Sequence, residues 1–146
     1  MRRLALLLVV GFALAGCGGG HGGMSTTNSL SATERETIVN NWEKFFSSET
    51  AVAGKVALLQ DGSRFKGLVT NFANNPLAKN VSATVSSVKL QGQDRAKVVY
   101  IVKFGGASLP KQTGTAVLQD GTWKVGSASL CKLVSLQGST PSVCKS

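Results

Sequence analysis

The chain has 146 residues, a single histidine, and 16 lysines and arginines against seven aspartates and glutamates, which gives a formal net charge of +9. This length supports one domain with one core. Acidic residues and histidine are too scarce to favour acid–base catalysis or a metal site rich in carboxylates or histidines. The basic excess favours anionic partners such as lipid headgroups, acidic glycans or nucleic acid.

The first residues have the layout of a bacterial export signal. Two arginines precede an apolar run over residues 4–13, and residues 14–17 then read Leu-Ala-Gly-Cys. The run is too short to span a bilayer, which takes about 20 apolar residues. The last four residues look like a bacterial lipobox, in which Cys17 receives a lipid and becomes the first mature residue. An uncleaved anchor or a plain signal peptide is the alternative.

We therefore predict a lipoprotein signal peptide over residues 1–16, a flexible Gly/Ser tether over 17–30 and a domain over 31–146. A palmitate-type lipid on Cys17 would hold the protein at the extracytoplasmic face of the cell membrane. Export argues against nucleic acid and leaves anionic lipid, anionic glycan or an envelope protein as partners. His21 falls within the tether, so we expect a solvated side chain rather than a ligand.

A long helix is predicted to begin near Ser31 to Thr33. Ser31 and Glu34 have the spacing of a capping box, in which each residue binds a backbone amide of the other. Apolar residues then recur at helical spacing, which gives the helix one face for a core. These residues are Ile38, Val39, Trp42, Phe45 and Phe46.

Two shorter helices are predicted to follow. Thr50 is placed to cap the first, which would end at Asp61-Gly62. Ser63 is placed to cap the second. That helix would end before Pro76, because a residue that precedes proline avoids the helical region.

Alternation of apolar and polar residues predicts strands over 81–90, 95–104 and 111–119 and a fourth from residue 122. The alternation slips phase at Ser86-Ser87, which predicts a bulge. Residues 91–94 and Asp120-Gly121 are typical of hairpin turns. Residues 128–136 fit a short helix better than a longer strand.

Helices come first and an antiparallel meander second. This order predicts an α+β fold in which the N-terminal helices pack on one face of a curved four-stranded sheet. Cys131 and Cys144 remain as an even pair in an exported protein, where disulfides persist. We predict a bridge between them that holds the C-terminal tail and the short helix to the body.

Several segments together resemble a known family. They are Trp42-x-x-Phe45-Phe46, residues 55–62 with Phe65, residues 114–125 and the closing cysteine pair. The chain resembles small actinobacterial secreted proteins and lipoproteins related to the mycobacterial low-molecular-weight antigen, over about residues 30–144. The resemblance implies a cystatin-like α+β cone of the nuclear-transport-factor-like kind. It implies no established activity and supplies no functional residues.

Catalytic chemistry is poorly supported. Enzymes on cone-shaped α+β folds usually place an aspartate or histidine inside the apolar cavity, but Asp61, Asp94 and Asp120 all fall in turn or loop positions. Glu43, next to Trp42, is the one candidate for a cavity acid. There is no Gly-x-Ser-x-Gly motif and no spacing typical of a metal site. We predict no catalytic residue, no cofactor and no metal.

Three hypotheses for function remain open. The first is a non-catalytic envelope lipoprotein that binds an apolar or anionic envelope molecule or a partner protein. The second is a small-pocket enzyme of isomerase type, which rests on fold analogy alone. The third is a purely structural or antigenic surface protein. If a pocket exists, the apolar faces of the predicted elements place four residues near it: Phe45, Phe72, Val102 and Trp123.

Overall fold

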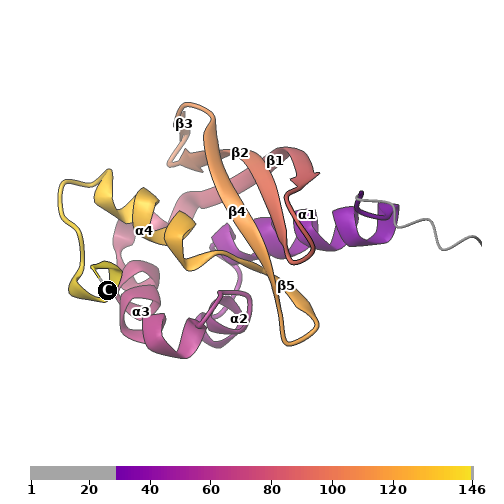
Figure 1. Ribbon diagram of the computed structural model, residues 1–146. Coiled ribbons are helices and arrows are strands. Elements are labelled where there is room, and N and C mark those ends of the chain that lie inside the picture. The colour runs from indigo at the N-terminus through magenta and orange to yellow at the C-terminus, as the bar shows by residue number, and fades with distance from the viewer. Residues whose placement is uncertain (1–28, 146) are drawn as a thin grey trace, which may run out of the picture.

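Helix α1 (Ala32–Phe46) packs on one face of a curled antiparallel sheet in the computed structural model, which describes residues 29–145 (Figure 1). The predicted signal peptide (residues 1–16) and residues 17–28 of the predicted tether, with Cys17 and His21, lie outside these residues. The other helices are α2 (Val52–Ala57), α3 (Lys66–Asn74) and α4 (Ser127–Ser135). The strands are β1 (Val81–Leu90), β2 (Arg95–Phe104), β3 (Ala107–Ser108), β4 (Gln112–Gln119) and β5 (Thr122–Val125). The predicted α+β architecture is therefore confirmed.

The sheet is a meander with the strand order β1-β2-β4-β5, and the two-residue strand β3 pairs with the end of β2. The register between β1 and β2 shifts between Val85 and Ser87, so the predicted bulge is present. Asp120 and Gly121 have φ angles of 53° and 74°. Positive φ at both central residues is what a type I′ hairpin turn requires, and it explains why Asp-Gly joins β4 to β5.

Helix α1 begins as the sequence predicts. Ser31 is the N-cap, and its hydroxyl accepts a hydrogen bond from the Glu34 backbone N–H while the Glu34 carboxylate accepts one from the Ser31 N–H. The carboxylate accepts hydrogen bonds from the Ser31 backbone N–H and hydroxyl, and these two bonds, led by the backbone one, hold the pKa of Glu34 below its ordinary value. The capping box fixes where the helix starts and so which residues it turns toward the sheet.

The next two helices begin differently from the prediction. Helix α2 has no side-chain cap, because its N-cap residue is Ala51, which has no polar side chain, and not the predicted Thr50. Ser63 falls inside a 3-10 turn, Gly62–Phe65, and α3 begins only at Lys66. The turn is tight because Gly62 lies against the Val56 carbonyl, where no side chain fits.

Both edges of the four-strand path are covered by the N-terminal half of the chain. Along β1, the Ser48 N–H donates to the Val81 carbonyl, and Arg35 Nη1 donates to the Val88 carbonyl at 2.6 Å. Along β5, Val125 pairs with the segment 58–60 through an N–H to Leu58 and a carbonyl that accepts from Gln60. Exposed edge strands invite pairing with other chains, so this cover also protects the sheet.

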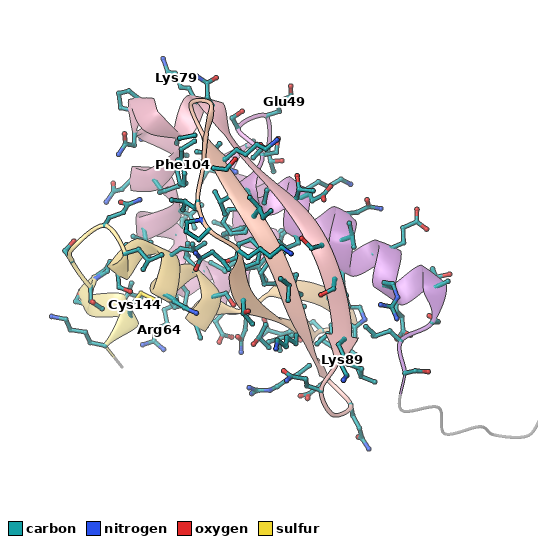
Figure 2. The ribbon with its side chains drawn as sticks, turned by 90° about the horizontal axis from the view of Figure 1, so that it is seen from above. Glu49, Arg64, Lys79, Lys89, Phe104 and Cys144 are labelled. Atoms are coloured by element: carbon teal, nitrogen blue, oxygen red, sulfur yellow. A yellow bond between two sulfur atoms is a disulfide. The ribbon has the colours of Figure 1, made fainter. Side chains whose placement is uncertain are left out.

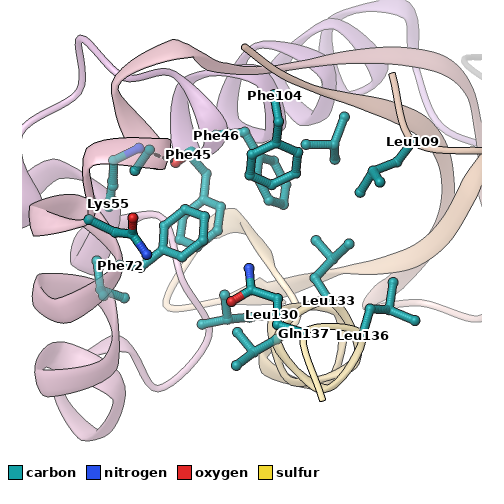
Figure 3. Close-up of a pocket in the computed structure, with 15 residues that line it drawn as sticks. Phe45, Phe46, Lys55, Phe72, Phe104, Leu109, Leu130, Leu133, Leu136 and Gln137 are labelled. Atoms are coloured by element: carbon teal, nitrogen blue, oxygen red, sulfur yellow. Dashed lines mark hydrogen bonds between the residues drawn. The ribbon is translucent and has the colours of Figure 1, made fainter. Parts of the chain in front are cut away.

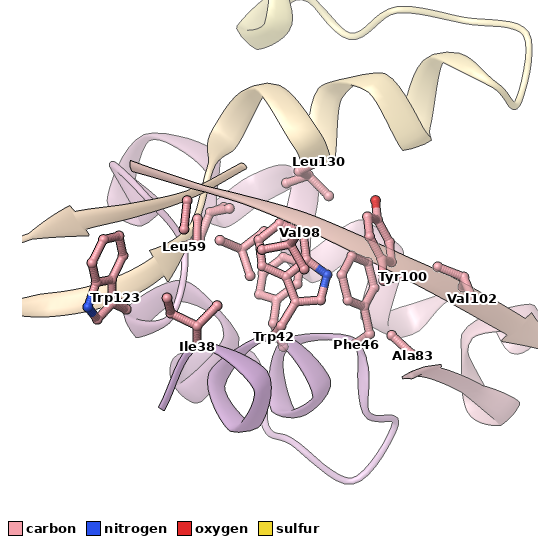
Figure 4. Packing of buried hydrophobic residues seen from close by; sticks show 14 of the residues in the cluster. Ile38, Trp42, Phe46, Leu59, Ala83, Val98, Tyr100, Val102, Trp123 and Leu130 are labelled. Carbon is pink, nitrogen blue, oxygen red and sulfur yellow. The ribbon is translucent and has the colours of Figure 1, made fainter. Parts of the chain in front are cut away.

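The core is centred on Trp42, which is 1% exposed and lies between Ile38 and Phe46 along α1 (Figure 4). Its ring meets that of Tyr100 edge-on at 5.2 Å, and Phe46 stacks on the same tyrosine at 5.6 Å. The Trp42 indole N–H has no hydrogen-bond partner within the described part of the chain. Leaving a buried donor unpaired costs about 1–3 kcal/mol, so the indole is held there by packing.

Gly114 of β4 makes that packing possible. A Cβ at this position would lie 2.8 Å from Trp42 Cζ2 and 2.8 Å from Ser129 Oγ. Both distances are shorter than real side chains tolerate, and the Ser129 hydroxyl is already engaged with the Thr115 N–H at 2.8 Å. The indole therefore rests directly on the backbone of β4.

The variant Gly114→Ala tests this contact. We expect it to lower the free energy of unfolding by about 1–3 kcal/mol, because the added methyl group displaces a buried indole. Gly67→Ala in α3 is the matched control, since nothing lies within 4 Å of its added Cβ; it should be neutral or stabilising by up to about 1 kcal/mol. Urea unfolding of both variants measures the difference, and equal stabilities would contradict the contact.

Candidate functional site

A cavity of about 440 Å³ lies between α3, α4 and the ends of α1 and β2 (Figure 3). Most of its wall is apolar, and the leucines of α4 line one side of it while aromatic rings line the other. The wall consists of Phe45, Phe46, Lys55, Val69, Phe72, Asn75, Ala78, Val102, Phe104, Leu109, Leu130, Leu133, Val134, Leu136 and Gln137. Asn75, Leu136 and Gln137 are exposed, and Leu136 is 59% exposed. These three residues form the rim.

The structure places three of the four predicted pocket residues on this wall: Phe45, Phe72 and Val102. Trp123 is the exception. It is buried against Leu118 of the neighbouring strand, at the other end of the core from Val102 (Figure 4). Its backbone carbonyl accepts a hydrogen bond from Asn41 Nδ2 at 2.9 Å, which ties β5 to α1. The alternation in β5 correctly turns Trp123 inward but does not tell which end of the sheet holds the cavity.

The predicted candidates omitted the α4 leucines and Lys55. Leu130, Leu133 and Leu136 recur every three residues in a predicted short helix, which is a signal for one apolar face but not for what that face meets. Lys55 had a subtler signal. It is the one charge between Val52 and Leu59, a stretch that is otherwise apolar apart from Gly54.

Lys55 is buried, with 7% of its surface exposed. Its Nζ donates to the carbonyl oxygens of Phe45 and Ser47, each at 2.6 Å, and lies 5.9 Å from the centre of the Phe45 ring. Those carbonyls end α1, where the helix dipole is negative and carbonyls lack partners within the helix. Burial lowers the pKa of Lys55. The ammonium thus caps α1 from inside the cavity wall.

Glu43, the candidate cavity acid, lies elsewhere. It is half-buried on α1, and its Oε1 accepts a hydrogen bond at 3.0 Å from the Val85 N–H. This amide lies at the bulge, where the register of β1 breaks. The carboxylate therefore satisfies a backbone donor of the edge strand and does not line the cavity.

Other titratable groups also serve the fold. Asp61 adopts a left-handed backbone with φ of 53°, and its carboxylate accepts a hydrogen bond from Gln119 Nε2 at 2.7 Å. Tyr100 is 1% exposed, and burial raises its pKa to about 12.

Among residues 29–145, no three His, Cys, Asp or Glu side chains cluster in a way that could hold a metal ion. Within the same residues, no helix has the length and apolarity needed to span a membrane.

Cys131 and Cys144 are joined by a disulfide, with Cα atoms 5.6 Å apart. Cys131 is in α4 and Cys144 ends the 3-10 turn Ser142–Cys144, so the bridge fastens the C-terminal tail to the helix that carries the cavity leucines. A closed loop of this length contributes about 3 kcal/mol in the chain-entropy model. The bridge limits how far α4 and its tail separate.

Comparison with known families assigns the chain to one of them. Residues 31–141 match the family model described as low molecular weight antigen MTB12, C-terminal domain. The chain belongs to this family. The match confirms the resemblance seen in the sequence and spans every residue of the cavity wall. No curated protein matches the chain. In this member of the MTB12 family, the cavity is thus formed entirely within the family domain.

The structural role of Glu43 is testable. We expect Glu43→Ala to lower the free energy of unfolding by about 1–3 kcal/mol, because it removes the acceptor of a partly buried backbone N–H. Glu36→Ala, an exposed position on the same helix, removes the same charge and should change stability by less than about 0.5 kcal/mol. Thermal unfolding of the two variants measures the two changes in stability. Equal effects would mean that the hydrogen bond to Val85 contributes nothing.

Proposed function

We propose that this domain is the non-catalytic binding module of an envelope lipoprotein, and that its cavity takes the apolar chain of an envelope molecule. The cavity itself carries the proposal. Its volume of about 440 Å³ falls in the range of about 300–1,000 Å³ that is usual for small-molecule sites, which are also mostly apolar. Protein interiors are otherwise close-packed, so a space of this size in a small domain favours binding over a purely structural role.

The chemistry of the wall favours binding over catalysis. An isomerase-type enzyme needs a group that accepts a proton from its substrate, usually a carboxylate or a histidine. Lys55 is the one ionisable side chain among the described residues of the wall. Its ammonium donates two hydrogen bonds to the backbone carbonyls at the end of α1, so the group is engaged in capping that helix.

Two lysines on the exposed surface of the sheet support a location of the domain beside anionic lipid or glycan of the envelope. Lys89 of β1 and Lys97 of β2 are exposed cross-strand partners, and like charges directly opposite each other destabilise a sheet. Lys89 lies near the β1–β2 hairpin, at the end of the sheet remote from Lys79 and Phe104 (Figure 2). Anionic lipid or glycan would offset this repulsion.

Apolar binding is tested by filling the cavity. We expect the wild-type domain to bind the neutral fluorescent probe N-phenyl-naphthylamine and to release it when dodecanol is added. Leu133→Trp should weaken probe binding at least about tenfold, because about 1.4 kcal/mol of apolar contact is lost. Ala128→Trp, at an exposed position of α4 outside the cavity, is the control. Failure of the wild type to bind either molecule would reject the proposed function.

The anchor is tested separately. Lipid on Cys17 should place the full chain in the membrane fraction of a bacterium that processes lipoproteins, because several acyl chains anchor a protein firmly. Cys17→Ala should move the domain to the soluble extracytoplasmic or secreted fraction. Retention of the variant in the membrane at wild-type levels would show that another feature provides the anchor.

A further inference from the structure

We propose that the cavity selects a long-chain carboxylate, with the acid group at Lys55 and the alkyl chain between α3 and α4. The inference rests on the proposed function and deepens it, because it names the headgroup of the ligand. It follows from a juxtaposition on the cavity wall. One cation, more than nine-tenths buried, adjoins a space whose wall is otherwise mostly apolar.

The Lys55 ammonium lacks a charged partner. No carboxylate among residues 29–145 forms a salt bridge with it. Buried charges are normally paired, since removing an ion from water is costly. The carbonyls of Phe45 and Ser47 provide only the partial negative charge of a helix end. An incoming carboxylate would complete the neutralisation.

The ammonium also has capacity for a ligand. It carries three N–H donors, and the two carbonyls take two of them. Because the carbonyls hold Nζ in place, the third donor would offer a ligand a hydrogen bond at a fixed position. A carboxylate fits this point better than a hydroxyl group, since a hydrogen bond between ions is about twice as strong as a neutral one.

The rest of the wall suits an alkyl chain. From Lys55 the aromatic rings of Phe45 and Phe72 lead toward Leu130 and Leu133 of α4, with exposed Leu136 at the rim (Figure 3). Asn75 and Gln137 are the other polar side chains of the described wall, and both are exposed to solvent. One charged point and a long apolar surface match a fatty acid.

Three ligands of equal chain length test the charge preference in the unaltered protein. Dodecanoate, dodecanol and dodecylammonium compete with N-phenyl-naphthylamine at neutral pH, below the solubility limit of dodecanol and the critical micelle concentrations of the two ions. We expect dodecanoate to bind most tightly and dodecylammonium most weakly, with at least about tenfold between these two. Binding of dodecanol as tight as or tighter than dodecanoate would overturn the carboxylate proposal while leaving the apolar proposal intact.

Lys55→Met then identifies the group responsible. Methionine keeps most of the apolar stem, and the ratio of dodecanol to dodecanoate dissociation constants should fall at least about tenfold. Lys79→Met is the control, since Lys79 is exposed beside Ala78 of the wall and its loss changes net charge equally. A merely structural lysine would weaken all three ligands alike. An unchanged ratio in a folded Lys55→Met variant would overturn the assignment.

Discussion

The fold depends on helix α1 and the segment after it closing both edges of the sheet. Ser48, Arg35 and Glu43 satisfy backbone groups of β1, and residues 58–60 pair with β5. A four-strand meander with open edges would be prone to intermolecular pairing. These hydrogen bonds join the N-terminal segments to the sheet, so the sheet and the N-terminal helices stabilise each other.

The cavity follows from where α1 ends. Trp42 fills the middle of the concave face and contacts the backbone at Gly114, but α1 stops at Phe46 while β2 continues to Phe104. Beyond the end of α1, helices α3 and α4 enclose a space beside the sheet and leave the cavity open between them. The same helix end presents the carbonyls that hold Lys55, so the apolar space and its one cation have a common origin.

Local features of this fold could be predicted from the sequence. The capping box at Ser31, the bulge beside Ser86 and the turn at Asp120-Gly121 each depend on neighbouring residues and elementary backbone preferences. The α+β order and the cysteine pair also depend on patterns visible along the chain. These features confine the topology to few alternatives.

The rest depends on contacts between distant segments. Nothing local indicates that α2 ends so that Leu58 can pair with Val125, or that Gly62 lies on the Val56 carbonyl. Trp123 was predicted to lie near the pocket but is not on the cavity wall, because the end of the sheet that holds the cavity depends on how α4 returns over it. Lys55 appears in the sequence only as an isolated charge, and its meaning depends on the carbonyls of a separate helix.

A long-chain carboxylate that enters the space between α3 and α4 would contact the side chains of the cavity wall. Nuclear Overhauser contacts between dodecanoate and the methyl groups of the labelled domain test it most directly. We expect contacts from the alkyl chain to Val69, Leu130 and Leu133, with the carboxylate end nearest Lys55. Contacts confined to methyl groups outside this wall, such as those of Val99 and Ile101, would contradict it.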